Sequence, residues 1–185
     1  MNRINVIVQE LKVRWLKKSL KETIIDFGSQ LKSPGRILVL LPADTSLRSK
    51  VLKNSRFLAE TLSMSEICFV SMPNDEIREL ARREGFRSFA PHQLEMSWYN
   101  FPNNSFFHRV RNLRSTMVVD LDFERNCFNA AVTVASGAPL RIGRFGVWGR
   151  PIHNIEVKSV KSADPYENLR SLLGVISSLK TGAVN

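Results

Sequence analysis

Two stretches of this sequence mix arginines with aromatic residues, a combination that could bind an anion or a nucleic acid. The stretches cover residues 98–114 and 141–150. Guanidinium groups grip phosphates, and aromatic rings stack on bases. The alternative is that the rings fill a core and the arginines are solvated. We predict an anion-binding surface formed by Lys17, Lys18, Lys21, Arg109, Arg111, Arg114, Arg141, Arg144 and Arg150, with aromatic contacts from Trp98, Tyr99 and Trp148.

Nucleophilic catalysis and metal binding find little support in the residue pattern. No Gly-x-Ser-x-Gly motif follows an expected strand, and no pair of cysteines or histidines has the spacing of a zinc site. Cys68 and Cys127 fall in an expected strand and an expected helix, so we predict buried, unreactive thiols. The carboxylates of residues 120–124 could hold a divalent cation, but we favour a strand exit followed by an acidic first helical turn. We predict no metal ion.

The loops that bind nucleotide cofactors are also missing. Residues 42–46 follow the first expected strand and contain no glycine, and the chain has no Walker lysine motif. The glycine-rich segment 143–149 precedes a proline and an expected strand rather than a helix. We therefore predict no dinucleotide and no other cofactor, although this segment could present arginines to an anion.

The charge of the chain favours an anionic partner. Its 185 residues carry a formal net charge of +10, and 43% of them are hydrophobic, which excludes a disordered chain. Residues 1–36 hold eight basic and three acidic side chains, residues 100–150 hold seven and three, and the segment between them is neutral. Two separate basic blocks are typical of proteins attracted to RNA, DNA or an anionic membrane, although basic surface residues also serve solubility alone.

The hydropathy of the sequence indicates where the protein is expected to be located. No apolar run approaches the roughly 18 residues of a transmembrane helix. The first residues lack the continuous apolar segment of a signal peptide. We expect a cytoplasmic protein.

Expected strands and helices alternate along most of the chain. Apolar runs predict strands at 36–41, 66–71, 87–90, 116–121, 140–143 and 154–158. Helical patterns lie between them, including one from residue 45 to about residue 62 that Asp44 or Thr45 can cap, and Asp164-Pro165 begins a final helix. This alternation predicts an α/β fold, with a mostly parallel sheet and helices on both faces. We expect a single Rossmann-like domain over residues 36–180, followed by a tail at 181–185.

A long helix is expected before this domain. Residues 1–33 form a basic amphipathic segment whose helix extends over roughly 3–31, with apolar residues mostly three or four positions apart. Ser33-Pro34-Gly35 then ends it. Whether this helix packs on the domain or projects from it stays open.

One segment resembles a known enzyme family. Val118-Val119-Asp120-Leu121 precedes a helix containing Ala130-Ala131, and Ser136-Gly137-Ala138-Pro139-Leu140-Arg141-Ile142-Gly143 follows it. This succession is similar to the amino-terminal domain of heptosyltransferase-like (family 9) glycosyltransferases, and to short single-domain bacterial proteins of unknown function related to that half. The resemblance spans roughly residues 36–180 and implies a Rossmann-like fold.

The same resemblance bears on activity. In those transferases an aspartate of a Gly-Asp pair after the first strand is the catalytic base. The matching positions here hold Leu47 and Arg48, with Asp44 nearby. The transferases also bind the nucleotide-sugar donor mainly with a second domain, for which 185 residues leave no room. The resemblance therefore implies the fold and argues against a complete transferase.

Three functions are consistent with these observations. The first is a non-catalytic protein that binds a polyanion, with RNA or a ribonucleoprotein particle such as the ribosome as the leading expectation. The second is the acceptor-binding half of a glycosyltransferase that works with a separate donor-binding chain. Asp44 would then be its base, and the loop 141–150 would hold a phosphorylated sugar. The third is peripheral attachment to a membrane through the N-terminal helix.

Overall fold

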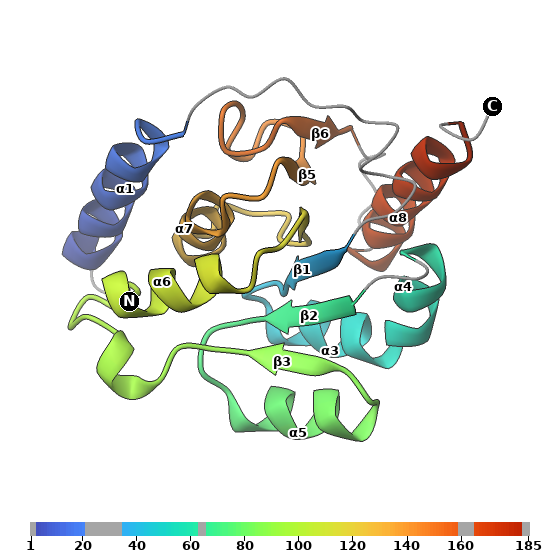
Figure 1. The fold of residues 1–185 in the computed structure, drawn as a ribbon, viewed down its shortest axis with the longest axis horizontal. Helices are drawn as coiled ribbons and strands as arrows, with labels where there is room; N and C mark the ends of the chain where they lie inside the picture. Colours follow the sequence, from blue (N-terminus) through green and yellow to red (C-terminus); the bar gives the residue numbers. More distant parts are fainter. Residues whose placement is uncertain (1–2, 21–34, 63–65, 159–164, 183–185) are drawn as a thin grey trace.

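Strands and helices alternate in the computed structural model, which describes residues 3–20, 35–62, 66–158 and 165–182 (Figure 1). In chain order the elements are α1 (Arg3–Lys17), β1 (Arg36–Leu40), α3 (Thr45–Lys53), α4 (Ser55–Thr61), β2 (Glu66–Val70), α5 (Asp75–Arg83), β3 (Arg87–Phe89), the 3-10 helix η1 (Gln93–Glu95), α6 (Asn104–Asn112), β4 (Met117–Asp120), α7 (Cys127–Ser136), β5 (Leu140–Arg144), β6 (Ile155–Val157) and α8 (Pro165–Gly182).

The described strands form one sheet in the order β3-β2-β1-β4-β5-β6. Each pairing between neighbouring strands is parallel. The direction of strand succession reverses between β1 and β4, which is the usual ligand position of open α/β sheets. The predicted α/β, Rossmann-like fold is confirmed.

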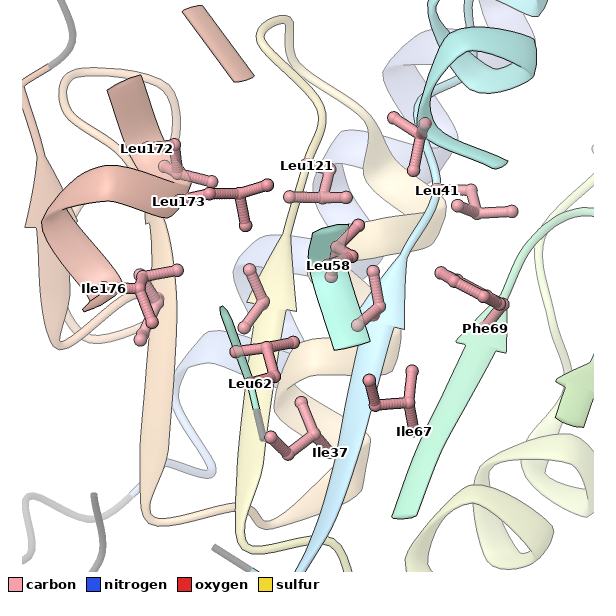
Figure 2. Close-up of a cluster of buried hydrophobic side chains, with 14 of the residues drawn as sticks. Ile37, Leu41, Leu58, Leu62, Ile67, Phe69, Leu121, Leu172, Leu173 and Ile176 are labelled. Atoms are coloured by element: carbon pink, nitrogen blue, oxygen red, sulfur yellow. The ribbon is translucent and has the colours of Figure 1, made fainter. Parts of the chain in front are cut away.

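Side chains of the central strands alternate between two apolar layers, as the pleat requires. Ile37 and Val39 face a cluster that includes residues of α3, α4, α5 and α8. Figure 2 shows part of this layer, where Leu58 of α4 and Leu172 of α8 lie over the strands. Leu38 and Leu40 face the opposite layer, which contains residues of α1, α6 and α7. Helices therefore cover both faces of the sheet.

Helix α7 forms the centre of the second layer. Every residue from Cys127 to Ser136 is buried. Asn126 caps its beginning by accepting hydrogen bonds from two backbone N–H groups, and Gly137 ends it with a positive φ of 65°. Both α1 and α6 pack on α7. The amino-terminal helix thus packs on the domain instead of projecting from it.

Two helix boundaries differ from the predictions. Helix α1 ends at Lys17, well before the predicted end near residue 31, and Lys18–Leu20 form tight turns stabilised by i→i−3 hydrogen bonds. Residues 21–34, including the predicted anion contact Lys21, lie outside the described residues. The helix predicted from residue 45 to residue 62 is divided at Asn54 into α3 and α4. Within the described residues, no helix is long and apolar enough to cross a membrane.

Glu66 connects three neighbouring strands at their amino ends. Its Oε2 atom accepts hydrogen bonds from Nε and Nη2 of Arg36 on β1, at 2.9 and 2.7 Å. Its other oxygen forms an ion pair with Arg87 of β3. The hydrogen bond from Arg36, helped by the charges of both arginines, holds the pKa of Glu66 below its ordinary value of 4.5.

This pKa predicts how stability responds to acid. Because the pKa of Glu66 is lower in the folded chain than in the unfolded chain, its stabilising contribution is complete above 4.5 and is lost as the pH falls through the folded value. We expect Glu66→Gln to lower the urea midpoint at about pH 7 and to lose less stability than wild type on acidification to about pH 3. Urea unfolding followed by circular dichroism measures both effects. The exposed Glu124→Gln serves as control, and equal acid sensitivity of Glu66→Gln and wild type would contradict the prediction.

Candidate anion-binding surface

Helix α1 is fixed to the domain along one side. Gln9 and Val13 are its buried residues, and they lie one helical turn apart. The side-chain amide of Gln9 donates hydrogen bonds to the backbone oxygens of Tyr99 and Asn100, at 2.6 and 3.3 Å. These bonds attach α1 to the loop before α6, while its apolar contacts go to α7. The orientation of α1 about its own axis is therefore set.

The opposite side of α1 exposes an apolar stripe. We call Ile4, Ile7, Leu11 and Trp15 the outer stripe. Between 57% and 69% of the surface of each of these residues is accessible. At 3.6 residues per turn these positions share one face, directly opposite Gln9 and Val13. The sequence pattern shows a stripe but does not show that the helix packs through its other side.

Cations border the outer stripe on both edges. Arg14 lies along one edge and Lys12 along the other, Lys18 follows directly after the helix, and all three are exposed. Within the described part of the chain, no hydrogen bond or ion pair engages their side chains. Lys17, which we predicted as an anion contact, is half-buried, whereas Lys18 is exposed.

Helix α6 adds further cations on the same side of the sheet. Arg111 is exposed near the end of this helix, and Arg114 is exposed two residues beyond it. Since α1 and α6 both pack on α7, the fold brings parts of the two basic blocks to the same side of the sheet (Figure 1). Of the predicted anion contacts, Lys17, Lys18, Arg111 and Arg114 belong to these two helices or follow directly after them on this side of the sheet.

Arg109 also belongs to α6 but has intramolecular partners. Its guanidinium forms an ion pair with Glu95 of η1. It also lies 4.6 Å from the centre of the Phe89 ring, an attractive cation–π distance. Arg109 thus joins α6 to β3 and η1, and it does not belong to the exposed cations described above.

Arg141 holds a buried structural position, unlike its predicted role. Only 5% of its surface is exposed. Its guanidinium donates to the backbone oxygens of Ile152, Ala138 and Pro151 at 2.9, 2.7 and 3.1 Å. Burial lowers the pKa of Arg141. An external anion would have to displace these three carbonyl oxygens, so the position of Arg141 corrects the expectation that it contacts one.

The other two cations of this segment differ from each other. Arg144 donates to the backbone oxygen of Phe123 at 2.9 Å and lies over the Phe123 ring, 5.4 Å from its centre. Arg150 is exposed and precedes Pro151 in a cis peptide bond. Of the predicted arginines at 141–150, only Arg150 is both exposed and without a described side-chain partner.

The predicted aromatic contacts also differ in exposure. Trp98 is 78% exposed and meets the half-buried Tyr99 edge-on, with ring centres 5.2 Å apart. Trp148 is half-buried below Arg125, whose guanidinium lies 5.5 Å from its ring centre. Trp98 is therefore the predicted aromatic residue with a ring most available to a partner.

The edge between β1 and β4 is closed by hydrogen bonds. Asp122 Oδ2 accepts from the backbone N–H of Ala43 at 3.0 Å, which ties the loop after β4 to the loop after β1. Asp120 Oδ1 accepts from Asn129 Nδ2 at 2.8 Å, and Asn129 also donates to the oxygen of Leu41. Burial raises the pKa of Asp122. These carboxylates connect loops, and no group of three metal-ligating side chains occurs among the described residues.

Asp44, the base of the transferase hypothesis, caps a helix. Its Oδ1 atom accepts from the backbone N–H of Leu47 at 2.7 Å, at the start of α3. The side chain is exposed at the carboxyl edge of the sheet. Because Arg141 is buried and Arg144 bonds to Phe123, neither of these predicted acceptor contacts presents a free guanidinium to Asp44.

Asp120 and His153 form a buried contact that the sequence does not indicate. His153 Nε2 lies 3.4 Å from Asp120 Oδ2, and both side chains are 1% exposed. His153 comes from the loop before β6, far along the chain from Asp120, so no local spacing indicates the contact. The ring of His153 fills the space above Gly143 of β5.

Comparison with models of known protein families gives no match for this chain, and comparison with curated proteins gives none either. The resemblance to heptosyltransferase-like proteins therefore stays a prediction from its motif.

The burial of both cysteines predicts that their thiols react slowly with alkylating reagents. Cys68 in β2 and Cys127 at the start of α7 are buried free thiols, and burial raises the pKa of each to about 11. Since the thiolate is the reactive form, we expect neither thiol to react with iodoacetamide near neutral pH until the chain unfolds. Mass spectrometry after labelling with and without urea measures this. Alkylation of either cysteine in the native chain, at the rate of the urea-unfolded chain, would contradict the prediction.

Proposed function

We propose that this protein is a non-catalytic binding protein whose polyanionic partner is an anionic lipid surface, with α1 as the binding element. The observation that carries this proposal is the outer stripe, an apolar face between two edges of exposed cations. Helices of this kind lie in the interface of a bilayer, with the apolar face among the acyl chains and the cations near the headgroups. Trp15 at one end of the stripe suits the interface, where tryptophan is enriched.

The attachment of α1 supports this proposal. Gln9 and Val13 hold one side of the helix on the domain, so the outer stripe faces outward before any partner arrives. A preformed site avoids part of the entropy cost of ordering a helix on binding. The exposed Arg111 and Arg114, on the same side of the sheet, add further attraction to anionic headgroups.

RNA is the second candidate, and a specific observation favours it. Trp98 presents an accessible ring, and the exposed cations of α1 and α6 lie on the same side of the sheet. The outer stripe argues for lipid instead. Ile4, Ile7 and Leu11 have no ring to stack on a base and would stay in water between phosphate contacts. The transferase hypothesis lacks comparable support, because Asp44 caps α3 and Arg141 is buried.

Flotation with vesicles tests the proposal. The whole chain is mixed with vesicles of phosphatidylcholine alone, or of phosphatidylcholine with phosphatidylglycerol, and centrifuged through a density gradient. We expect flotation with the anionic vesicles, little with the neutral ones, and partial loss in raised salt because only the electrostatic part is screened. A mobility-shift assay with RNA is run in parallel. Retention of RNA with no flotation would replace lipid by RNA as the partner, and absence of both would refute a polyanion-binding function.

A further inference from the structure

A cavity of about 200 Å³ lies at the carboxyl ends of β2 and β3, away from the outer stripe. Its polar lining comes from separate elements: Ser71 follows β2, Ser88 lies in β3, Asn74 precedes α5, Arg78 lies in α5, His92 precedes η1, and Arg109 extends from α6. Ile77 and Phe89 supply an apolar wall. Residues from five parts of the chain thus converge on one small volume.

One cation of this cavity is rigidly placed. Glu95 engages a single guanidinium nitrogen of Arg109, and the Phe89 ring supports the guanidinium plane from 4.6 Å. An arginine has five N–H donors, so the nitrogens that Glu95 does not engage keep donors for a further acceptor. Holding Arg109 from two sides reduces the ordering cost of binding an anion.

The second cation is free to move towards a ligand. Arg78 interacts with Asp75 across one helical turn at 3.3 Å, and both side chains are strongly exposed. An exposed pair of this kind contributes little to stability. Exchanging the contact with Asp75 for a contact with a doubly charged ligand therefore costs little.

The position of the cavity fits the topology of the sheet. Open α/β sheets bind ligands outside the carboxyl ends of their strands, usually where the strand order reverses. Here the reversal between β1 and β4 is closed by the hydrogen bonds from the backbone N–H of Ala43 to Asp122 and from the side-chain amide of Asn129 to Asp120. The neighbouring ends of β2 and β3 remain open, and Arg78 of α5 and Arg109 of α6 line the cavity there.

We infer that this cavity binds a phosphate monoester of a small polar molecule. Arg78 and Arg109 would hold the phosphate from two directions, as guanidinium groups do with dianionic oxygens. Ser71 and Ser88 offer hydroxyls to the oxygens, while Ile77 and Phe89 face the carbon skeleton. The volume of about 200 Å³ admits a phosphate with a short carbon chain or one small ring. This inference does not depend on lipid binding by α1.

Calorimetric titration with glycerol 3-phosphate, with glycerol as the uncharged comparison, tests the inference. We expect binding of the phosphate only. Arg78→Gln should weaken it by about tenfold or more, since a hydrogen bond to a charged group is lost. Arg82→Gln, an exposed arginine on the same helix but outside the cavity, is the matched control and should leave affinity within about twofold.

A second experiment distinguishes a soluble phosphate monoester from a lipid headgroup that carries the same group. Vesicles of phosphatidylcholine with phosphatidic acid present the phosphate monoester as a lipid headgroup. Loss of glycerol 3-phosphate binding in Arg78→Gln assigns a soluble ester. Because α1 also binds anionic vesicles, the headgroup is assigned if glycerol 3-phosphate does not bind and Arg78→Gln binds these vesicles more weakly than wild type. No Arg78-dependent binding in either arm, or equal weakening by Arg78→Gln and Arg82→Gln, overturns the inference. Flotation with phosphatidylglycerol vesicles is unaffected by Arg78→Gln, so failure here is distinguishable from failure of the proposed function.

Discussion

Replacing Leu11 and Trp15 with serine should reduce binding to anionic vesicles by at least about tenfold. Both side chains belong to the outer stripe and are more than half exposed. Full burial of a large apolar side chain is worth about 1.5–3 kcal/mol, and each 1.4 kcal/mol is a factor of ten in affinity. If each of the two side chains contributes only half of this burial free energy to binding, their replacement still lowers the affinity by about tenfold. Flotation over a range of lipid concentrations measures it.

A matched control separates this effect from a general loss of hydrophobicity. Leu94 is 93% exposed in η1 and lies outside α1, so Leu94→Ser should leave flotation unchanged. Neither variant removes buried surface of any size, so their urea midpoints should stay close to that of wild type. Equal flotation of wild type and of the Leu11→Ser/Trp15→Ser variant would refute the outer stripe as the binding element.

The largest expected loss of stability comes from Gly143→Ala. A Cβ atom at this position of β5 would overlap the ring of His153, with the ring Cγ only 2.6 Å away and two further ring atoms closer. His153 is 1% exposed and lies against Asp120, so the ring has no free space to enter. Overpacking of a core typically costs 1–3 kcal/mol and occasionally more, and we expect about 3 kcal/mol here. Urea unfolding measures this free energy.

A double-mutant cycle identifies the cause of that loss. In the His153→Ala background the space above Gly143 is empty, so adding Gly143→Ala should cost much less than it does in the wild-type chain. Gly174→Ala, in α8, is the opposite control. Nothing lies near a Cβ at that exposed helical site, and we expect about 0.5–1 kcal/mol of stabilisation. The same cost for Gly143→Ala in both backgrounds would show that the His153 ring is not responsible.

The fold could be predicted because the sequence of each short segment indicates whether that segment forms a strand or a helix. Apolar runs such as residues 36–41 are long enough for a buried strand and too short for a helix, and a proline follows three of the six runs within two residues. The division of α3 from α4 at Asn54 was not predictable in the same way. Both halves keep apolar residues at helical spacing, and the break has no glycine or proline to mark it.

The site was less predictable, because the position of an arginine depends on partners far away in the sequence. Arg141 and Arg150 have similar neighbours in the sequence. Arg141 is nevertheless buried and donates to carbonyl oxygens of the loop before β6, whereas Arg150 is exposed. Arg109 is likewise held by Glu95 and Phe89. Charge counting found the basic blocks correctly, but it could not separate the arginines that hold the fold together from those that face outward.

The central claim is that the outer stripe enters a lipid bilayer, and a fluorescent label on that stripe tests it most directly. Because Cys68 and Cys127 are buried, Ile7→Cys provides one accessible thiol for an environment-sensitive nitrobenzoxadiazole label while Leu11 and Trp15 stay in place. With phosphatidylglycerol-containing vesicles we predict a blue shift and a rise in emission for this label. The same label at Arg83→Cys, exposed at the end of α5, should show neither. An unchanged emission spectrum at position 7 in the presence of these vesicles would contradict the claim.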